Sequence, residues 1–179
     1  MVQGREQGRG FVQARPVMSV QEVEAFLDRE FPQIHLDGRV YTIEAVGDLT
    51  ASMRLKASDR HIRPGGTLSG PSMMTLADLA LYVAILANVG PVALAVTTNL
   101  AFNFLRKPEP RDLLAEARLL KLGRRLAVGE VSLFSAGSRD LVCHATGTYS
   151  LPSSRWRYYN TASRKSRRNM RFPAPGEPH

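Results

Sequence analysis

The sequence has little cysteine, little histidine and no apolar run long enough to span a membrane. The single cysteine, Cys143, excludes an internal disulfide and fits a reducing compartment, so we expect a cytoplasmic protein. Four scattered histidines form no zinc-binding pattern with that cysteine. The N-terminal residues lack the apolar core of a secretory signal. The most apolar run, residues 79–96, is broken by Gly90 and Pro91, which leaves too few residues for a membrane span.

The net charge of +8 belongs to the two ends of the chain. Residues 1–16 carry +2 and residues 153–179 carry +6, whereas residues 17–152 carry equal numbers of acidic and basic side chains. The composition predicts a flexible N-terminal segment, one domain over residues 17–152 and a disordered basic tail. The tail combines Arg with aromatic residues and could bind nucleic acid or anionic lipid, although a solvated tail without a partner is the more common case. Only this tail offers a surface for nucleic acid.

Apolar spacing predicts one surface helix, one buried helix and several strands. Ser19 and Glu22 form a capping box at the start of an amphipathic helix that ends before Pro32. A second helix begins near Pro71 and is apolar on nearly every face, which is typical of a helix buried all round. Alternating patterns predict strands over residues 41–47, 49–56, 96–104, 113–121, 125–135 and 141–151. A buried helix followed by strands without regular βαβ alternation predicts an α+β fold.

One carboxylate interrupts the apolar helix. Asp78 is the only Asp, Glu, Lys, Arg or His between Arg63 and Arg106. A buried lone carboxylate is costly unless it is paired, hydrated or protonated, and such groups gather at functional sites. A structural hydrogen bond to a neighbouring loop is the alternative, and the residues alone do not decide between the two.

The loop before this helix reads H-I-R-P-G-G-T-L-S-G-P from His61 to Pro71. With the L-A-D that ends at Asp78, it resembles the hotdog-fold acyl-CoA thioesterases of the PaaI, or phenylacetate-pathway, type. Their signature is H-x-N-x-x-G-x-x-H-G-G, then four residues, then L-x-D. The positions that fit it are His61, Gly66, Gly70, Leu76 and Asp78. The departures are Arg63 for Asn, Ser69 for His and Pro71 for the last Gly.

The resemblance implies roles for three residues. The backbone N–H of Gly70 would polarise the thioester carbonyl, and Asp78 would act as general base on a water or as direct nucleophile. Thr97 aligns with a hydroxyl residue that orients the attacking water from a neighbouring subunit. A strand residue chosen only for packing is the alternative for Thr97. Asn99 lies on the same face of the predicted strand and is a further candidate contact.

Other residues are candidates for contact with the substrate. Ser69 is expected to be a turn or cap residue with a smaller chance of substrate contact. Arg63 could pair with Asp78 and so weaken it as a base, or bind an acyl carboxylate or a phosphate. His61 is a candidate substrate contact, although a hydrogen-bonded loop histidine is the more common case. Arg106 and Arg124 flank strand ends and could bind the phosphates of coenzyme A.

The resemblance implies that this α+β arrangement is a hotdog fold, with an antiparallel sheet wrapped around one long central helix and an extra N-terminal helix. The implied activity is hydrolysis of acyl-CoA to free acid and CoA by Asp78-activated water, with no metal or bound cofactor. The family implies sites between subunits, and therefore a homodimer or a dimer of dimers. The alternative is a non-catalytic acyl-CoA binding or sensing module in which Arg63 neutralises Asp78.

Overall fold

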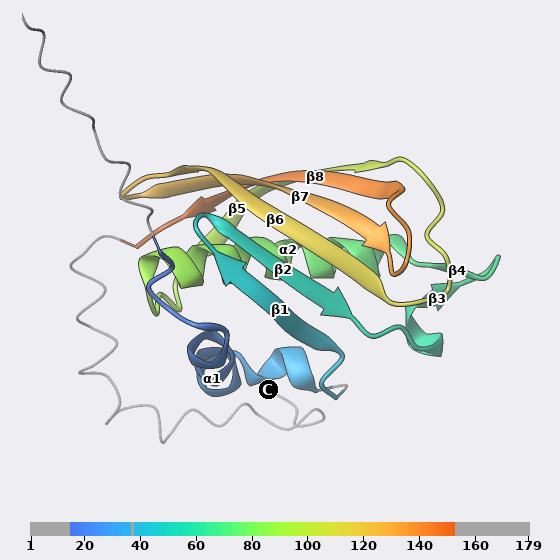
Figure 1. The fold of residues 1–179 in the computed structure, drawn as a ribbon, viewed down its shortest axis with the longest axis horizontal. Coiled ribbons are helices and arrows are strands. Elements are labelled where there is room, and N and C mark those ends of the chain that lie inside the picture. The colour runs from blue at the N-terminus through green and yellow to red at the C-terminus, as the bar shows by residue number, and fades with distance from the viewer. Residues whose placement is uncertain (1–14, 37, 153–179) are drawn as a thin grey trace, which may run out of the picture.

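The computed structural model describes residues 15–36 and 38–152, and the predictions for residues 1–14 and 153–179 lie outside this range. Six strands form an antiparallel sheet that wraps one long helix, α2 (Gly70–Val89) (Figure 1). In sheet order these strands are β1 (Tyr41–Gly47), β2 (Thr50–Leu55), β6 (Leu113–Leu122), β7 (Leu126–Ser135), β8 (Leu141–Ser150) and β5 (Val96–Phe104). All six predicted strands and the α+β class are confirmed.

Short elements complete the described chain. Helix α1 (Val20–Glu30) precedes a 3-10 turn, η1 (Pro32–His35), and both lie beside β1 on the helix side of the sheet (Figure 1). A second 3-10 turn, η2 (Asp59–His61), leads into a small hairpin of β3 (Ile62–Arg63) and β4 (Thr67–Leu68). This hairpin lies within the predicted loop and ends next to the start of α2. It was not among the predicted strands.

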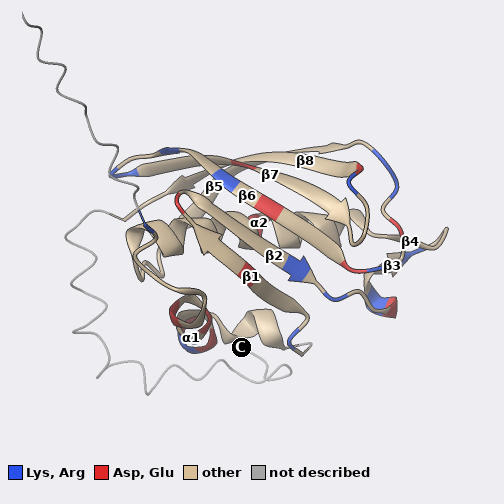
Figure 2. Ribbon diagram, viewed as in Figure 1, with Lys and Arg blue, Asp and Glu red and all other residues tan. Residues whose placement is uncertain are grey.

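Helix α2 forms the centre of the core, as its apolar sequence predicts. Every side chain from Leu79 to Ala87 is buried, whereas Met74 in the first two turns is 42% exposed. Contrary to the expectation from the sequence, the helix is long and apolar enough to cross a membrane, because its apolar residues extend on both sides of Asp78. Of that apolar window, 72% is buried inside the fold. Charged residues lie on α1, the loops and the strands, while α2 is almost free of them (Figure 2). Its hydrophobic surface is therefore covered by the sheet and by α1.

Two glycines on neighbouring strands let α2 approach the sheet closely. Gly129 of β7 and Gly147 of β8 are direct cross-strand partners. A Cβ atom at Gly129 would lie 2.6 Å from Leu81 Cδ2 and 2.9 Å from the carbonyl oxygen of Arg118. A Cβ atom at Gly147 would lie 2.6 Å from Leu81 Cδ1. The side chain of Leu81 therefore fills the space that these two residues leave by having no side chains.

Helix α1 is fixed by its cap and by its apolar face. The Ser19 hydroxyl accepts from the Glu22 N–H, and the Glu22 carboxylate accepts from the Ser19 N–H at 2.8 Å, which confirms the predicted capping box. Phe26 and Leu27 are buried, and the helix ends before Pro32 as predicted. This anchoring holds Phe31 and η1 over the flank of α2, where they contribute to the candidate site.

The glycine pair yields a stability prediction. Gly129→Ala should lower the free energy of unfolding by roughly 1–3 kcal/mol, because the added methyl group meets Leu81 and the fixed backbone of β6. Gly70→Ala is the matched control, since its Cβ atom would lie 3.7 Å from Phe104, an ordinary contact. Urea unfolding of both variants gives the comparison. A Gly129→Ala variant as stable as Gly70→Ala would contradict this account of the packing.

Candidate active site

Asp78 lies about two turns into α2, between two hollows that α1 and η1 help to enclose. The first, here the large hollow, has a volume of about 570 Å³ and is mainly apolar. It is lined by Ile34, Tyr41, His61, Met74, Asp78, Leu100 and Phe102, among others. The second, here the small hollow, has a volume of about 400 Å³ and is lined by Glu30, Asp78, Tyr82, Thr97 and Tyr149, among others. The carboxylate of Asp78 is thus half-buried rather than enclosed.

Two hydroxyl groups donate to one oxygen of the Asp78 carboxylate. The Thr97 hydroxyl donates to Oδ1 at 2.8 Å, and the Tyr149 hydroxyl donates to the same atom. The same Tyr149 hydroxyl lies 2.9 Å from the backbone carbonyl oxygen of Asp78, which is its second acceptor. Within the described chain, Oδ2 receives no hydrogen bond. The arrangement orients the carboxylate through one oxygen and leaves the other available for chemistry.

A bulge in β5 brings Thr97 to this position. Thr97 pairs with Tyr149 across the β5–β8 ladder and Asn99 pairs with Thr148, so Thr98 is the extra residue. The insertion interrupts the alternation of faces, and Thr97 lies with Tyr149 on the helix side of the sheet. Asn99 lies opposite Thr148 instead. The prediction that Asn99 shares the face of Thr97 is therefore wrong, because a strict two-residue period contains no bulge.

The start of α2 lies in a third hollow, here the helix-end hollow, of about 470 Å³. It is lined by Arg63, Gly70, Met73, Phe104, Arg106 and Lys107, among others. Ser69 is the N-cap of α2, and its hydroxyl accepts from the Ser72 N–H, which confirms the predicted cap. The Gly70 N–H belongs to the first turn of α2, so it has no partner within the helix, and Pro71 has no N–H. The hollow therefore combines basic side chains with the positive end of a helix.

Arg63 and Asp78 lie apart. Arg63 is exposed and lines the helix-end hollow, whereas Asp78 lines the large and small hollows. No ion pair joins the two among residues 15–36 and 38–152. The pairing that would weaken Asp78 as a base is therefore absent from this part of the chain. Gly70 and Asp78 are likewise in different hollows of the same chain.

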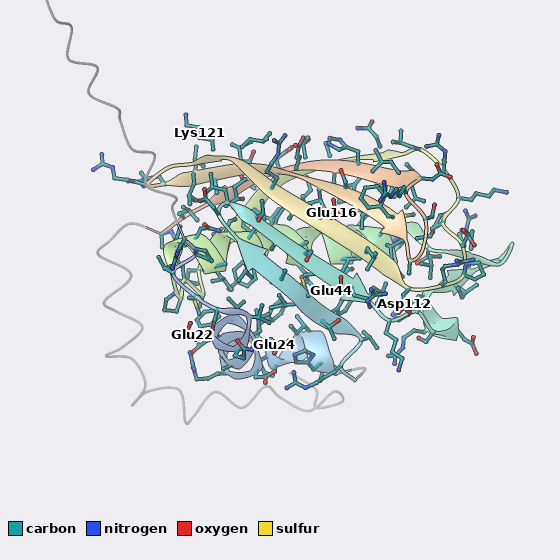
Figure 3. All side chains as sticks on the ribbon, viewed as in Figure 1. Glu22, Glu24, Glu44, Asp112, Glu116 and Lys121 are labelled. Carbon is teal, nitrogen blue, oxygen red and sulfur yellow. The ribbon has the colours of Figure 1, made fainter. Side chains whose placement is uncertain are left out.

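The other candidates are divided between the site and its surroundings. His61 is 6% exposed, and its Nδ1 accepts from the Ser58 N–H at 3.1 Å, as expected for a hydrogen-bonded loop histidine. Arg106 donates to the carbonyl oxygen of Leu141 from the rim of the helix-end hollow. Arg124 belongs to the turn between β6 and β7. Lys121, three residues earlier, lies at the end of the sheet away from the β3–β4 hairpin (Figures 1 and 3). The structure does not bring Arg124 near Arg106 within one chain.

Tyr149 was missed by the sequence analysis. It is 3% exposed and stacks on Tyr82, with ring centroids 6.4 Å apart and an interplanar angle of 10°. Burial, followed by the nearby Asp78 carboxylate, raises the pKa of the Tyr149 phenol. Burial and then Glu30 raise the pKa of Tyr82 to about 12. A tyrosine on the apolar face of the last strand was the available signal, since a buried phenol needs a hydrogen-bond partner.

Comparison with known proteins decides the family. Residues 65–142 match the model of the thioesterase superfamily. A Pseudomonas aeruginosa protein named as an esterase is 33% identical over 138 residues, which cover 76% of this chain and 100% of that protein. The chain belongs to the thioesterase superfamily. Membership in this superfamily supports hydrolysis of an acyl thioester as its general activity.

Solved structures place this thioesterase among the PaaI-like hotdog proteins. A crystal structure from Silicibacter sp. TM1040, titled as a thioesterase, is 48% identical with a TM-score of 0.71, covering 79% of this chain and 96% of that one. A mutant of the phenylacetic acid degradation protein PaaI from Thermus thermophilus is 26% identical with a TM-score of 0.56, covering 63% and 93%. The predicted PaaI-like resemblance and hotdog fold are confirmed.

Proposed function

We propose that this thioesterase hydrolyses acyl-CoA thioesters with Asp78 as its catalytic carboxylate. The observation that carries the proposal is the position of Asp78, which is held by two hydroxyl donors at one oxygen and lines an apolar hollow. A merely structural carboxylate would be expected to use both oxygens for hydrogen bonds, as buried polar groups usually do. The free Oδ2 and the adjoining space suit a group that acts on a substrate.

The proposed reaction uses water as the nucleophile. Oδ2 of Asp78 accepts a proton from water while the water oxygen attacks the thioester carbonyl carbon. The tetrahedral intermediate then collapses, the C–S bond breaks, and the proton passes to the leaving sulfur, which yields the free acid and CoA. The Thr97 hydroxyl donates a hydrogen bond to Asp78, so the lone pairs of its oxygen are free to accept a hydrogen bond from that water. In this proposal Thr97 acts in the same chain as Asp78.

The large hollow is the proposed site of the acyl group. Leu100 and Phe102 of β5 line one side, and Ile34 of η1 lines another. Apolar walls of this kind favour a hydrocarbon or aromatic acyl group, since its transfer from water is favourable. The polar residues of the lining, besides Asp78, are Gln33, Tyr41, His61 and Thr75.

The helix-end hollow is the proposed site of the carbonyl oxygen and of the CoA phosphates. The Gly70 N–H is aimed from the first turn of α2 and suits a developing oxyanion. Arg63, Arg106 and Lys107 would bind phosphate groups. However, Asp78 follows Gly70 by eight positions along α2, a rise of about 12 Å. One chain alone does not present both groups to the same carbonyl.

A second copy of the chain resolves this separation. Strand β5 is an edge of the sheet, paired only with β8 within the described residues, and it runs along α2 with Thr97 at Asp78 and Phe104 beside Gly70. Two β5 edges paired antiparallel about a two-fold axis would place the Thr97 end of one copy against the Phe104 end of the other. Asp78 of one copy would then face Gly70 of its partner.

The exposed surface along this edge supports a homodimer. Val96, Phe104 and Leu105 are each about half exposed, at 51%, 51% and 52%. Pairing would remove these apolar side chains from water and satisfy the open edge of β5. A dimer of dimers would require a further contact on another face. The proposal includes no metal or bound cofactor, and places the reaction in the cytoplasm, where a free thiol such as Cys143 stays reduced.

A non-catalytic acyl-CoA binding module is the alternative. It requires a counter-charge that neutralises Asp78, and Arg63 was the candidate. Within one chain the two lie in different hollows, so Arg63 does not neutralise the Asp78 of its own chain. In the proposed dimer, Arg63 of the second copy would line the hollow that faces Asp78, so turnover by the wild-type protein is what distinguishes hydrolysis from binding alone.

The proposal predicts that turnover depends on Asp78. CoA release from short-, medium-, long-chain and aromatic acyl-CoAs should fall at least about 1000-fold in Asp78→Ala, while binding and fold survive. Circular dichroism and binding of a non-hydrolysable acyl-CoA analogue serve as controls. Saturable binding without turnover by the wild-type protein would instead favour the binding module.

A second prediction distinguishes the loss of the Gly70 N–H from the addition of a side chain at position 70. Gly70→Pro removes the donor, and proline is tolerated in the first turn of a helix, so kcat should fall roughly 100- to 1000-fold. Gly70→Ala keeps the donor and adds only a methyl group in ordinary contact with Phe104, so kcat should stay close to wild type. Steady-state kinetics of the two variants gives the test. Equal kcat values would remove the Gly70 N–H from the mechanism.

A further inference from the structure

We propose that Tyr149 is a positioning residue that holds the Asp78 carboxylate in its reactive orientation. The inference rests on the proposed function, because it concerns the same carboxylate. Its basis is the geometry of the small hollow, where the phenol, the Thr97 hydroxyl and the carboxylate meet.

The Tyr149 hydroxyl contacts Asp78 at two atoms. One is Oδ1 of the side chain and the other is the backbone carbonyl oxygen, at 2.9 Å. A single phenol therefore joins the carboxylate to the backbone of its own helix. This restricts rotation of the Asp78 side chain, because moving Oδ1 would break the contact. Oδ2 is thereby held in a defined direction while it stays free of donors from the described residues.

The sheet delivers both donors to the same oxygen. Thr97 and Tyr149 are direct cross-strand partners, and directly opposed side chains lie on one face of a sheet. The bulge at Thr98 is what gives Thr97 this partner and this face. The register of β5 against β8 therefore places the two hydroxyl groups next to each other. Such a support is expected to keep the carboxylate within a narrow range of orientations.

The hydroxyls of Thr97 and Tyr149 are important because no Lys or Arg side chain of the described residues lines the two hollows around Asp78. The titratable groups that line them with Asp78 are Glu30 of α1, Tyr41 of β1, His61 of η2, Tyr82 of α2 and Tyr149 of β8. Glu30 has the same charge as Asp78 and does not attract its carboxylate. The hydroxyls of Thr97 and Tyr149 are therefore the groups that orient the carboxylate on this side.

Tyr149 is suited to remain a donor throughout an assay. Burial and the adjacent carboxylate both raise the pKa of its phenol, so it stays protonated at and above neutral pH. Its ring stacks on Tyr82, whose own hydroxyl points to the carbonyl oxygen of Ala93 at 3.4 Å. Tyr82 therefore supports the ring of Tyr149 without donating to Asp78. This makes Tyr82 a matched control.

The test compares Tyr149→Phe with Tyr82→Phe, which each remove one phenol oxygen from the same aromatic pair. Without its donor, the carboxylate is free to rotate, so the reactive orientation is populated less. In Tyr149→Phe, kcat should therefore fall about 10-fold with KM within about two-fold of wild type. Tyr82→Phe should keep kcat within about two-fold of wild type.

Two further measurements keep the test decisive. Carbon-13 NMR at neutral pH should show a changed chemical shift of the Asp78 carboxyl in Tyr149→Phe and a much smaller change in Tyr82→Phe, whether or not the protein turns over. Site-specific 3-fluorotyrosine at position 149 preserves the ring and makes the phenol a stronger donor, so the chemical shift should move in the opposite direction.

The outcomes separate the two proposals. An unchanged kcat and Asp78 carboxyl chemical shift in Tyr149→Phe, or equal changes in Tyr149→Phe and Tyr82→Phe, would overturn the role of Tyr149. If Tyr149→Phe does not fold, an unchanged carboxyl chemical shift in the fluorinated protein would overturn it. A wild-type protein without turnover would overturn the proposed hydrolysis, while the carboxyl chemical shift would still decide whether Tyr149 holds the carboxylate.

Discussion

The hydrogen bonds from Thr97 and Tyr149 to Asp78 are the contacts on which the candidate site depends. Helix α2 has to be apolar on every face because the sheet and α1 cover it, and a carboxylate in such a helix is costly to bury. The two hydroxyls offset part of that cost and also fix the orientation of the group. The same contacts that offset the cost of burying Asp78 therefore also hold its carboxylate in the orientation that the proposed reaction needs.

Much of the fold could be predicted from the sequence because its signals are local. The capping box at Ser19, the apolar period of α2 and the alternation along the strands each depend on residues close in the chain. Asp78 could be identified as the candidate carboxylate for a similar reason, since it is the only charged residue in a long apolar stretch. Its partners could not be identified in this way.

The missed features depend on long-range register and on three-dimensional position. The bulge at Thr98 is defined only by the pairing of β5 with β8, so the alternation rule gave Asn99 the wrong face. Tyr149 is 71 residues from Asp78 in the chain, and nothing local marks it as a partner. Arg63 is close to Asp78 in sequence but enters a different hollow because the β3–β4 hairpin and the start of α2 carry it to the helix end.

The most direct test of the account is whether Asp78 and Gly70 of different copies form one site. Asp78→Ala and Gly70→Pro chains, each nearly inactive alone, are co-expressed with different tags and isolated as a random mixture of dimers. Half the dimers would then be mixed, each with one intact site of two, so activity should recover to about a quarter of wild type. A mixture no more active than its separate components, with mixed dimers verified by both tags, would contradict a site shared between two copies.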